Sequence, residues 1–138
     1  MNYTDIISKW KEKKIDSIEK LDQQLSNFRI TFAYNSGTIE NPQITYHATR
    51  EVFENGKVIN FCGDTQTIFE IENQKKCYNF LVPKIINKDP ITSDLIKKIH
   101  YQLMQGVYDE HRWQKGERPG HYKIHDYVIG KSNQGALP

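Results

Sequence analysis

One apolar stripe near the N-terminus constrains the fold of this chain more than any other feature. Its side chains recur at alternating steps of three and four residues: Ile18, Leu21, Leu25, Phe28 and Phe32. An α-helix turns once in about 3.6 residues, so this spacing places the whole stripe on one helical face. We therefore predict a long helix over residues 1–34, with Thr4 or Asp5 at its N-cap. Its stripe would serve an internal core or the interface of a homodimer equally well.

Three shorter helices are predicted in the segment 45–106, which we expect to form the helical core. Each is indicated by a capping residue followed by apolar positions at helical spacing. The predicted ranges are Thr45 to Gly56, Asp64 or Thr65 to about Pro83, and Thr92 to Gly106. The sequence NSG at 35–37 should interrupt the long helix, because all three residue types offer the backbone alternatives to helix. A separate turn over 36–41 follows, and Pro42 ends it.

The chain changes character after residue 111. The stretch HRWQKGERPG is rich in turn-forming residues, and HYKIHDYVIG then carries β-forming residues in loose alternation. We predict a β-hairpin over residues 121–136. The sequence thus predicts a single domain over 1–138 that is mainly α, with one β-hairpin.

Composition excludes several classes of protein. With 138 residues the chain is long enough for one domain, and its 37% of hydrophobic residues argues against a disordered one. The net charge is only +2 and the lysines are dispersed, so we expect no nucleic-acid partner. No run approaches about 18 apolar residues, so we expect no membrane partner. Cys62 and Cys77 lack metal or redox spacing and are interpreted as core residues in a reducing compartment, which indicates the cytoplasm.

No complete active site is visible in the sequence. His111, His121 and His125 cluster near acidic residues, but this turn-rich stretch lacks the rigid ligand geometry of a metal site. His100 is interpreted as a core or boundary residue of its helix. The turns GERPG and GKSNQG lack the spacing of a phosphate-binding loop. We therefore expect no metal and no cofactor in this chain.

The stretch SGTIEN at 36–41 has two interpretations. Ser36 and Glu40 are four residues apart, so on one helical turn they point the same way. A hydroxyl and a carboxylate presented together could accept hydrogen bonds from an arginine side chain. The alternative is a terminal helical turn that ends in a solvated acid.

Taken with its surroundings, NSGTIENPQIT resembles the inhibitory-helix motif of Fic-domain (Fido) proteins. That motif is Ser or Thr, three residues, Glu, and then Gly or Asn. Thr45 and the segment HATREVFENG stand where the family has a loop threonine and a short helix ending in glycine. Further on, LMQGVYDEHRWQKGERPGHYKIHDYVIG is similar to the family segment that leads into its flap hairpin. The resemblance covers roughly residues 25–138.

The resemblance implies a partial Fic-like helical bundle with one β-hairpin flap. Most Fic proteins transfer AMP from ATP to a hydroxyl of a target protein, and ATP and Mg²⁺ are expected for the complete family enzyme. Ser36, Glu40 and Asn41 would be regulatory residues. Glu40 would pair with an arginine of the catalytic loop and hold ATP in a pose where attack fails.

The flap would hold the target protein by adding a segment of it as a strand. The flap residues implied by the resemblance are Tyr122, Lys123, Ile124, His125, Asp126, Tyr127, Val128, Ile129 and Gly130. Lys123 stands where the family commonly has arginine.

The family's catalytic motif, HxFxxGNGR, does not occur in these 138 residues. We therefore expect no AMP transfer by this chain alone. Three hypotheses follow. The chain is the N-terminal portion of an AMP transferase, or a regulatory module that acts in trans on a separate catalytic chain as antitoxins of the family do, or an unrelated helical interaction domain.

Overall fold

The computed structural model describes residues 1–126, and six helices follow one another in that part of the chain. They are α1 (Tyr3–Glu12), α2 (Ile18–Glu40), α3 (Tyr46–Asn55), α4 (Thr65–Ile86), α5 (Ser93–Leu103) and α6 (Glu110–Gln114). The prediction of a mainly α protein is confirmed.

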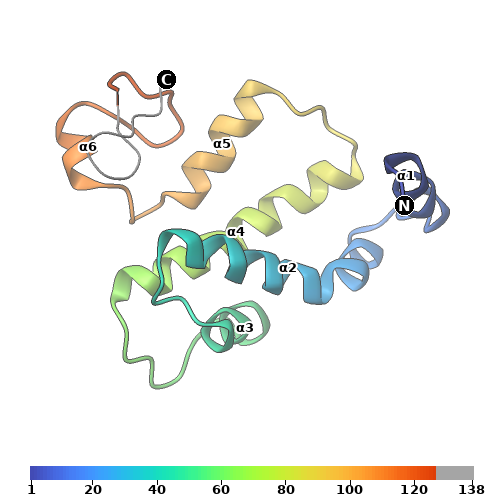
Figure 1. Ribbon diagram of the computed structural model, residues 1–138, viewed down its shortest axis with the longest axis horizontal. Coiled ribbons are helices and arrows are strands. Elements are labelled where there is room, and N and C mark those ends of the chain that lie inside the picture. Colours follow the sequence, from blue (N-terminus) through green and yellow to red (C-terminus); the bar gives the residue numbers. More distant parts are fainter. Residues whose placement is uncertain (127–138) are drawn as a thin grey trace.

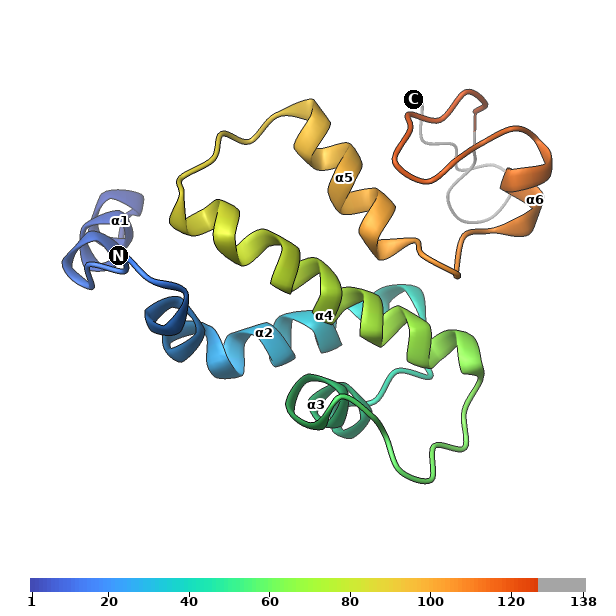
Figure 2. The same cartoon turned by 180° about the vertical axis from the view of Figure 1, so that it is seen from behind.

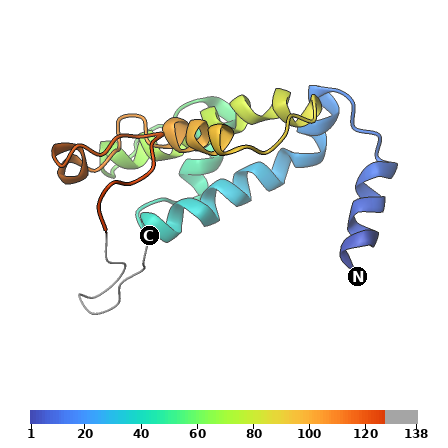
Figure 3. The ribbon, with the colours of Figure 1, turned by 90° about the horizontal axis from the view of Figure 1, so that it is seen from above.

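The two longest helices, α2 and α4, pack against each other and organise the rest (Figures 1 and 2). Helix α3 packs on both of them, and α5 packs on α4 alone. The short helix α6 lies beyond the end of α5. Helix α1 stands apart from the other helices, as the view from above shows most clearly (Figure 3).

The core is small and lies where α2, α3 and α4 meet. One cluster of buried side chains joins the start of α3 to α4, and a second joins α2 to the end of α3. The first consists of Ile44, Ala48, Val52 and Ile71, and the second of Ile30, Ala33 and Phe53. Burial of a side chain of this size contributes roughly 1.5–3 kcal/mol, so these few contacts hold the three helices together.

The prediction of one helix over 1–34 is wrong, because two helices occupy that range. Lys14 adopts a left-handed backbone conformation with a φ of 46°, which no α-helix can continue. Ser17 then starts α2, because its side chain accepts a hydrogen bond from the N–H of Lys20. The apolar stripe begins at Ile18 and therefore lies wholly within α2, so it gave no support to a helix before Ser17.

The predicted interruption at 35–37 is also wrong, since α2 continues through these residues to Glu40. Gly37 is buried, and a Cβ atom added there would lie 2.8 Å from the Cδ1 of Ile44. Because Gly37 has no side chain, Ile44 can pack directly against the backbone of α2. This packing offsets the low helix propensity of the segment. The predicted separate turn at 36–41 is the last turn of α2.

The later helices agree more closely with the sequence. Thr45 and Thr92 cap α3 and α5 as predicted, and Gly56 ends α3 with a φ of 75°. Helix α4 begins after Asp64 but passes through Pro83 and ends three residues later. A proline in the last turn removes only one helical hydrogen bond, so α4 tolerates it there.

The predicted hairpin is not seen where the structure describes the chain. Residues 121–126 form no strand, and the remaining residues of the predicted range, 127–136, lie outside the described residues. The N–H groups of Ile124 and His125 both bond to the side chain of Glu117 instead of to a neighbouring strand.

The two cysteines differ in their surroundings. Cys77 is buried as predicted, and burial raises the pKa of its thiol. Cys62 is exposed, so its predicted place in the core is wrong. It lies in the loop between α3 and α4, where Val58 and Phe61, and not Cys62, pack against the buried cluster.

Asn73 should be essential to the attachment of α5. This residue is buried at 2% exposure, and its amide donates to the carbonyl oxygens of Leu103 and Gln105 at 3.1 and 2.7 Å. The Asn73→Ala substitution leaves both acceptors unpaired, so we expect it to lower the free energy of unfolding by about 1–3 kcal/mol in urea titrations. Asn79→Ala, at an exposed position of the same helix, is the matched control and should change it by less than about 0.5 kcal/mol. Equal effects of the two substitutions would contradict this role.

Candidate functional site

The end of α2 opens onto a cavity of about 540 Å³ whose other walls come from α4, α5 and the segment that leads into α6. Both polar and apolar side chains line it. The polar residues of the lining are Ser36, Glu40, Glu70, Gln74, His100, Tyr108, Asp109 and Arg112. The tertiary structure thus brings two of the predicted regulatory residues, Ser36 and Glu40, to one cavity.

Ser36 and Glu40 lie one helical turn apart in the last two turns of α2. Ser36 is half-buried and Glu40 is exposed at the cavity mouth. Within residues 1–126, the carboxylate of Glu40 has no hydrogen-bonded or ionic partner. The last turn of α2 also contains no basic residue. A negative charge at the C-terminal end of a helix is unfavourable toward the helix dipole, so this position favours a cationic partner.

Asn41, the third predicted regulatory residue, does not line the cavity. Its amide nitrogen donates to the hydroxyl of Thr67 at 3.0 Å and to the carboxylate of Glu70 at 2.7 Å. Its side-chain oxygen accepts a hydrogen bond from the N–H of Gln43 at 3.0 Å. Asn41 therefore joins the end of α2, next to Glu40, to the first turns of α4.

The opposite wall of the cavity carries His100 and Arg112. The Nδ1 atom of His100 accepts a hydrogen bond from the N–H of Gly120 at 2.9 Å. Burial lowers the pKa of His100, and the nearby positive charge of Arg112 lowers it further. His100 is thus a satisfied boundary residue, as predicted. Asp109 caps α6 by accepting a hydrogen bond from the N–H of Arg112 at 2.8 Å.

Sequence reasoning missed most of this wall. Arg112 belongs to a helix that the turn-rich sequence did not predict, and Glu70 and Gln74 lie far from the motif in the chain. The local signal that could have predicted α6 was Asp109 as an N-cap residue, followed by the sequence EHRW.

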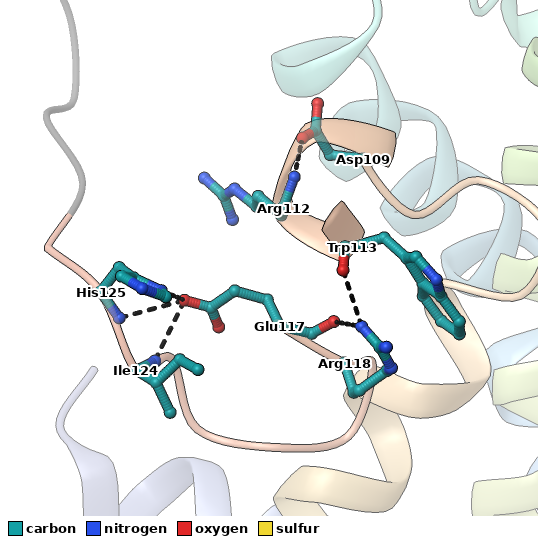
Figure 4. A network of polar contacts seen from close by, with 7 residues as sticks. All are labelled: Asp109, Arg112, Trp113, Glu117, Arg118, Ile124 and His125. Atoms are coloured by element: carbon teal, nitrogen blue, oxygen red, sulfur yellow. Dashed lines mark hydrogen bonds and ion pairs between the residues drawn. The ribbon is translucent and has the colours of Figure 1, made fainter. Parts of the chain in front are cut away.

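The start of the predicted flap is anchored on one buried carboxylate (Figure 4). Glu117, at 3% exposure, accepts hydrogen bonds from the N–H groups of Ile124 and His125, both at 3.1 Å. The Nδ1 atom of His125 also lies 3.3 Å from this carboxylate. Arg118 stacks on the ring of Trp113 at 3.8 Å and donates to its carbonyl oxygen. This network holds the segment 117–125 against α6.

The predicted flap residues divide into two groups. The described ones are exposed: Tyr122, Lys123, Ile124, His125 and Asp126. The others lie outside the described residues: Tyr127, Val128, Ile129 and Gly130.

An apolar groove of about 420 Å³ lies next to the cavity, between α2, α4 and α5. Ser36, Gln74 and Leu103 border both. The groove contains much of the apolar stripe of α2, and Phe28 and Phe32 remain 58% and 55% exposed there. A cluster of exposed aromatic side chains beside a polar cavity is a surface that a further protein segment could cover.

Comparison with the models of known protein families, with curated proteins and with solved structures finds no match to this chain. Among residues 1–126, no group of three or more histidine, cysteine, aspartate or glutamate side chains could hold a metal ion.

A double-mutant cycle tests the contact that shapes the end of α2. Gly37→Ala places a methyl group against the Cδ1 of Ile44, so we expect a loss of about 1 kcal/mol in the free energy of unfolding. In an Ile44→Val background that atom is absent, and the same substitution should stabilise the protein through helix propensity. A coupling energy of about 1 kcal/mol or more is expected. Additive effects within about 0.3 kcal/mol would show that the contact does not constrain α2.

The lowered pKa of His100 predicts a pH dependence of stability. The folded protein binds a proton at His100 less readily than the unfolded chain does, so this residue contributes stability above pH 6.5 that is lost as the pH falls below it. We expect His100→Gln to reduce the fall in the free energy of unfolding between pH 7.5 and 5. His47→Gln, on an exposed histidine of α3, is the matched substitution control. A fall in the free energy of unfolding that is the same in His100→Gln as in the wild type would contradict the prediction.

Proposed function

We propose that this chain is the N-terminal regulatory and target-docking portion of a Fic-type protein adenylyltransferase, with Glu40 as its autoinhibitory residue. The observation that carries the proposal is the shared position of Ser36 and Glu40 at one cavity, next to an uncovered apolar groove. Two residues of the motif that suggested the family thus line a cavity, which supports the proposal.

The electrostatics of α2 support the role of Glu40. Its carboxylate stands at the negative end of a 23-residue helix and has no cationic partner within residues 1–126. An arginine from a catalytic segment would bind the carboxylate through two hydrogen bonds and would also oppose the helix dipole. Ser36, one turn earlier, offers a hydroxyl to the same guanidinium. An arginine held in this way is withheld from the γ-phosphate of ATP, which is the inhibition that the family resemblance implies.

The apolar groove supports the presence of a further segment. Its lining is almost entirely hydrophobic. Phe28 and Phe32 are 58% and 55% exposed, and a segment that covered the groove would remove this exposed surface from water. Burial of such area is worth roughly 25 cal/mol per Å², which is enough to hold a helix in place. We propose that the segment with the HxFxxGNGR motif packs here, so that its arginine reaches Glu40.

This segment either continues the same polypeptide or belongs to a separate chain, in which case the protein acts in trans. Both arrangements use the same groove and the same carboxylate. ATP and Mg²⁺ would bind to the complete assembly. The target protein would dock by strand addition at the flap, whose first residues Glu117 anchors.

Removal of the Glu40 charge tests the proposal. The chain is assembled with the polypeptide that carries HxFxxGNGR, and AMP transfer is measured from ATP labelled on the α-phosphate. Because a charge-assisted pair is worth about 1.5–3 kcal/mol, Glu40→Gln should raise the transfer rate by about tenfold or more. The wild-type chain alone should transfer no label.

Glu19→Gln is the matched control, because it removes the same charge from the opposite end of α2. It should leave the transfer rate unchanged. An assembly in which Glu40→Gln binds the catalytic polypeptide normally but shows the wild-type rate would overturn the proposal. A catalytic polypeptide that binds the Phe28→Ser/Phe32→Ser variant as tightly as the wild type would overturn the placement of that segment in the groove.

A further inference from the structure

Helix α1 packs against no other helix in the part of the chain that the structure describes. All ten of its residues are exposed, and the ribbon shows it projecting from one end of the bundle (Figure 3). Tyr3, Ile6, Ile7 and Trp10 are 84%, 42%, 49% and 42% exposed. A globular protein rarely leaves an apolar helix face of this kind in water without a partner for it.

The helix is well formed in spite of this isolation. Asn2, two residues before the predicted cap, accepts a hydrogen bond from the N–H of Asp5 at 2.9 Å. The side chain of Asp5 accepts one in return from the N–H of Asn2 at 3.2 Å. This reciprocal capping box stabilises the first turn. Local hydrogen bonds therefore hold α1 together, and its apolar face is left for an external contact.

The apolar residues of α1 form one continuous face. Projected at about 100° per residue, Ile6, Trp10, Tyr3 and Ile7 follow one another within an arc of roughly 100°. Two of these four residues are Trp10 and Tyr3, the aromatic types that favour the boundary between water and lipid.

The charges of α1 are arranged around this face in a regular order. Lys9 follows Ile6 on one side of the apolar arc, and Lys11 follows Ile7 on the other. Asp5 and Glu12 lie on the opposite side of the helix. Lysines beside an apolar face can keep their stems on lipid while their ammonium groups reach phosphate, and acids opposite the face stay in water.

We propose that α1 is an interfacial anchor that lies in the surface of an anionic lipid bilayer. The apolar face enters the boundary between headgroups and acyl chains, and Lys9 and Lys11 bind lipid phosphate from its two sides. The proposal departs from the expectation from the sequence that the protein has no membrane partner. It concerns the surface alone, because no helix within residues 1–126 is long and apolar enough to cross a bilayer. The anchor is independent of the proposed adenylyltransferase role.

A second copy of the chain fits α1 less well. Ten residues span only about 15 Å, which is too short to bury the roughly 800 Å² per partner of a stable dimer. The lysines that border the apolar face would also approach those of the other copy. A bilayer of anionic lipid has the complementary charge and no such limit on area.

Co-sedimentation of the full chain with vesicles tests the proposal. One set of vesicles contains 70% phosphatidylcholine and 30% phosphatidylserine, and the other phosphatidylcholine alone. We expect sedimentation with the anionic vesicles and little with the neutral ones. Lys9→Gln/Lys11→Gln should weaken the partition into anionic vesicles roughly thirtyfold, since each lysine near such a surface contributes about a fivefold factor. Ile7→Ser/Trp10→Ala should abolish it.

Lys57→Gln/Lys76→Gln is the matched control, because it removes the same charge from exposed positions outside α1. It should partition like the wild type. Circular dichroism and thermal unfolding of each variant show that the bundle remains folded, which is expected because α1 contributes no buried residue. A wild-type chain that stays in the supernatant overturns the proposal. Equal losses in the two lysine variants also overturn it. So does a dimer, seen by ultracentrifugation, that Ile7→Ser/Trp10→Ala dissociates while vesicles bind no protein.

Discussion

The close approach of Ile44 to the backbone of Gly37 is the contact on which the arrangement of this protein depends. A Cβ atom at position 37 would lie only 2.8 Å from the Cδ1 atom of Ile44. With glycine there, the chain folds back directly after α2, and Ile44 joins the buried cluster that holds α3 on α4. Asn41 completes this corner through its hydrogen bonds to Thr67 and Glu70. Ser36 and Glu40 face the cavity because the corner holds the last turn of α2 there.

The far wall of the cavity is held in a different way. Helix α5 contains no fully buried residue, so apolar packing alone does not fix it. Its C-terminal end is held by the amide of Asn73, and the segment after α6 is attached through His100 and the buried carboxylate of Glu117. Polar contacts of this kind are directional but modest in net energy. The wall with Arg112 thus depends on polar contacts, whereas the packing of Ile44 also holds the corner that carries Glu40.

Two of the exposed apolar surfaces within the described residues differ in shape and in the charges that border them. The groove between α2, α4 and α5 is concave and lined by aromatic and aliphatic side chains, with Arg29 over the rings of Phe53 and Tyr78 at its edge. Such a shape suits a protein helix. The face of α1 is convex, narrow and bordered by Lys9 and Lys11, which suits an anionic surface. The two proposals thus place a polypeptide on one surface and lipid on the other.

The sequence by itself determined the features that depend on neighbours in the chain. Thr45 and Thr92 as caps, Gly56 as a helix end and the four-residue spacing of Ser36 and Glu40 all follow from local hydrogen bonds and helical periodicity. Only the tertiary structure decided the features that depend on distant residues. Helix α2 continues through the sequence NSG because Ile44 packs on Gly37. Much of its apolar stripe lines an open groove, while Ile30 and Ala33 enter the core. Arg112 lines the cavity because it belongs to a helix that the sequence pattern did not predict. Periodicity shows which residues share a face, but the other helices decide whether that face is buried.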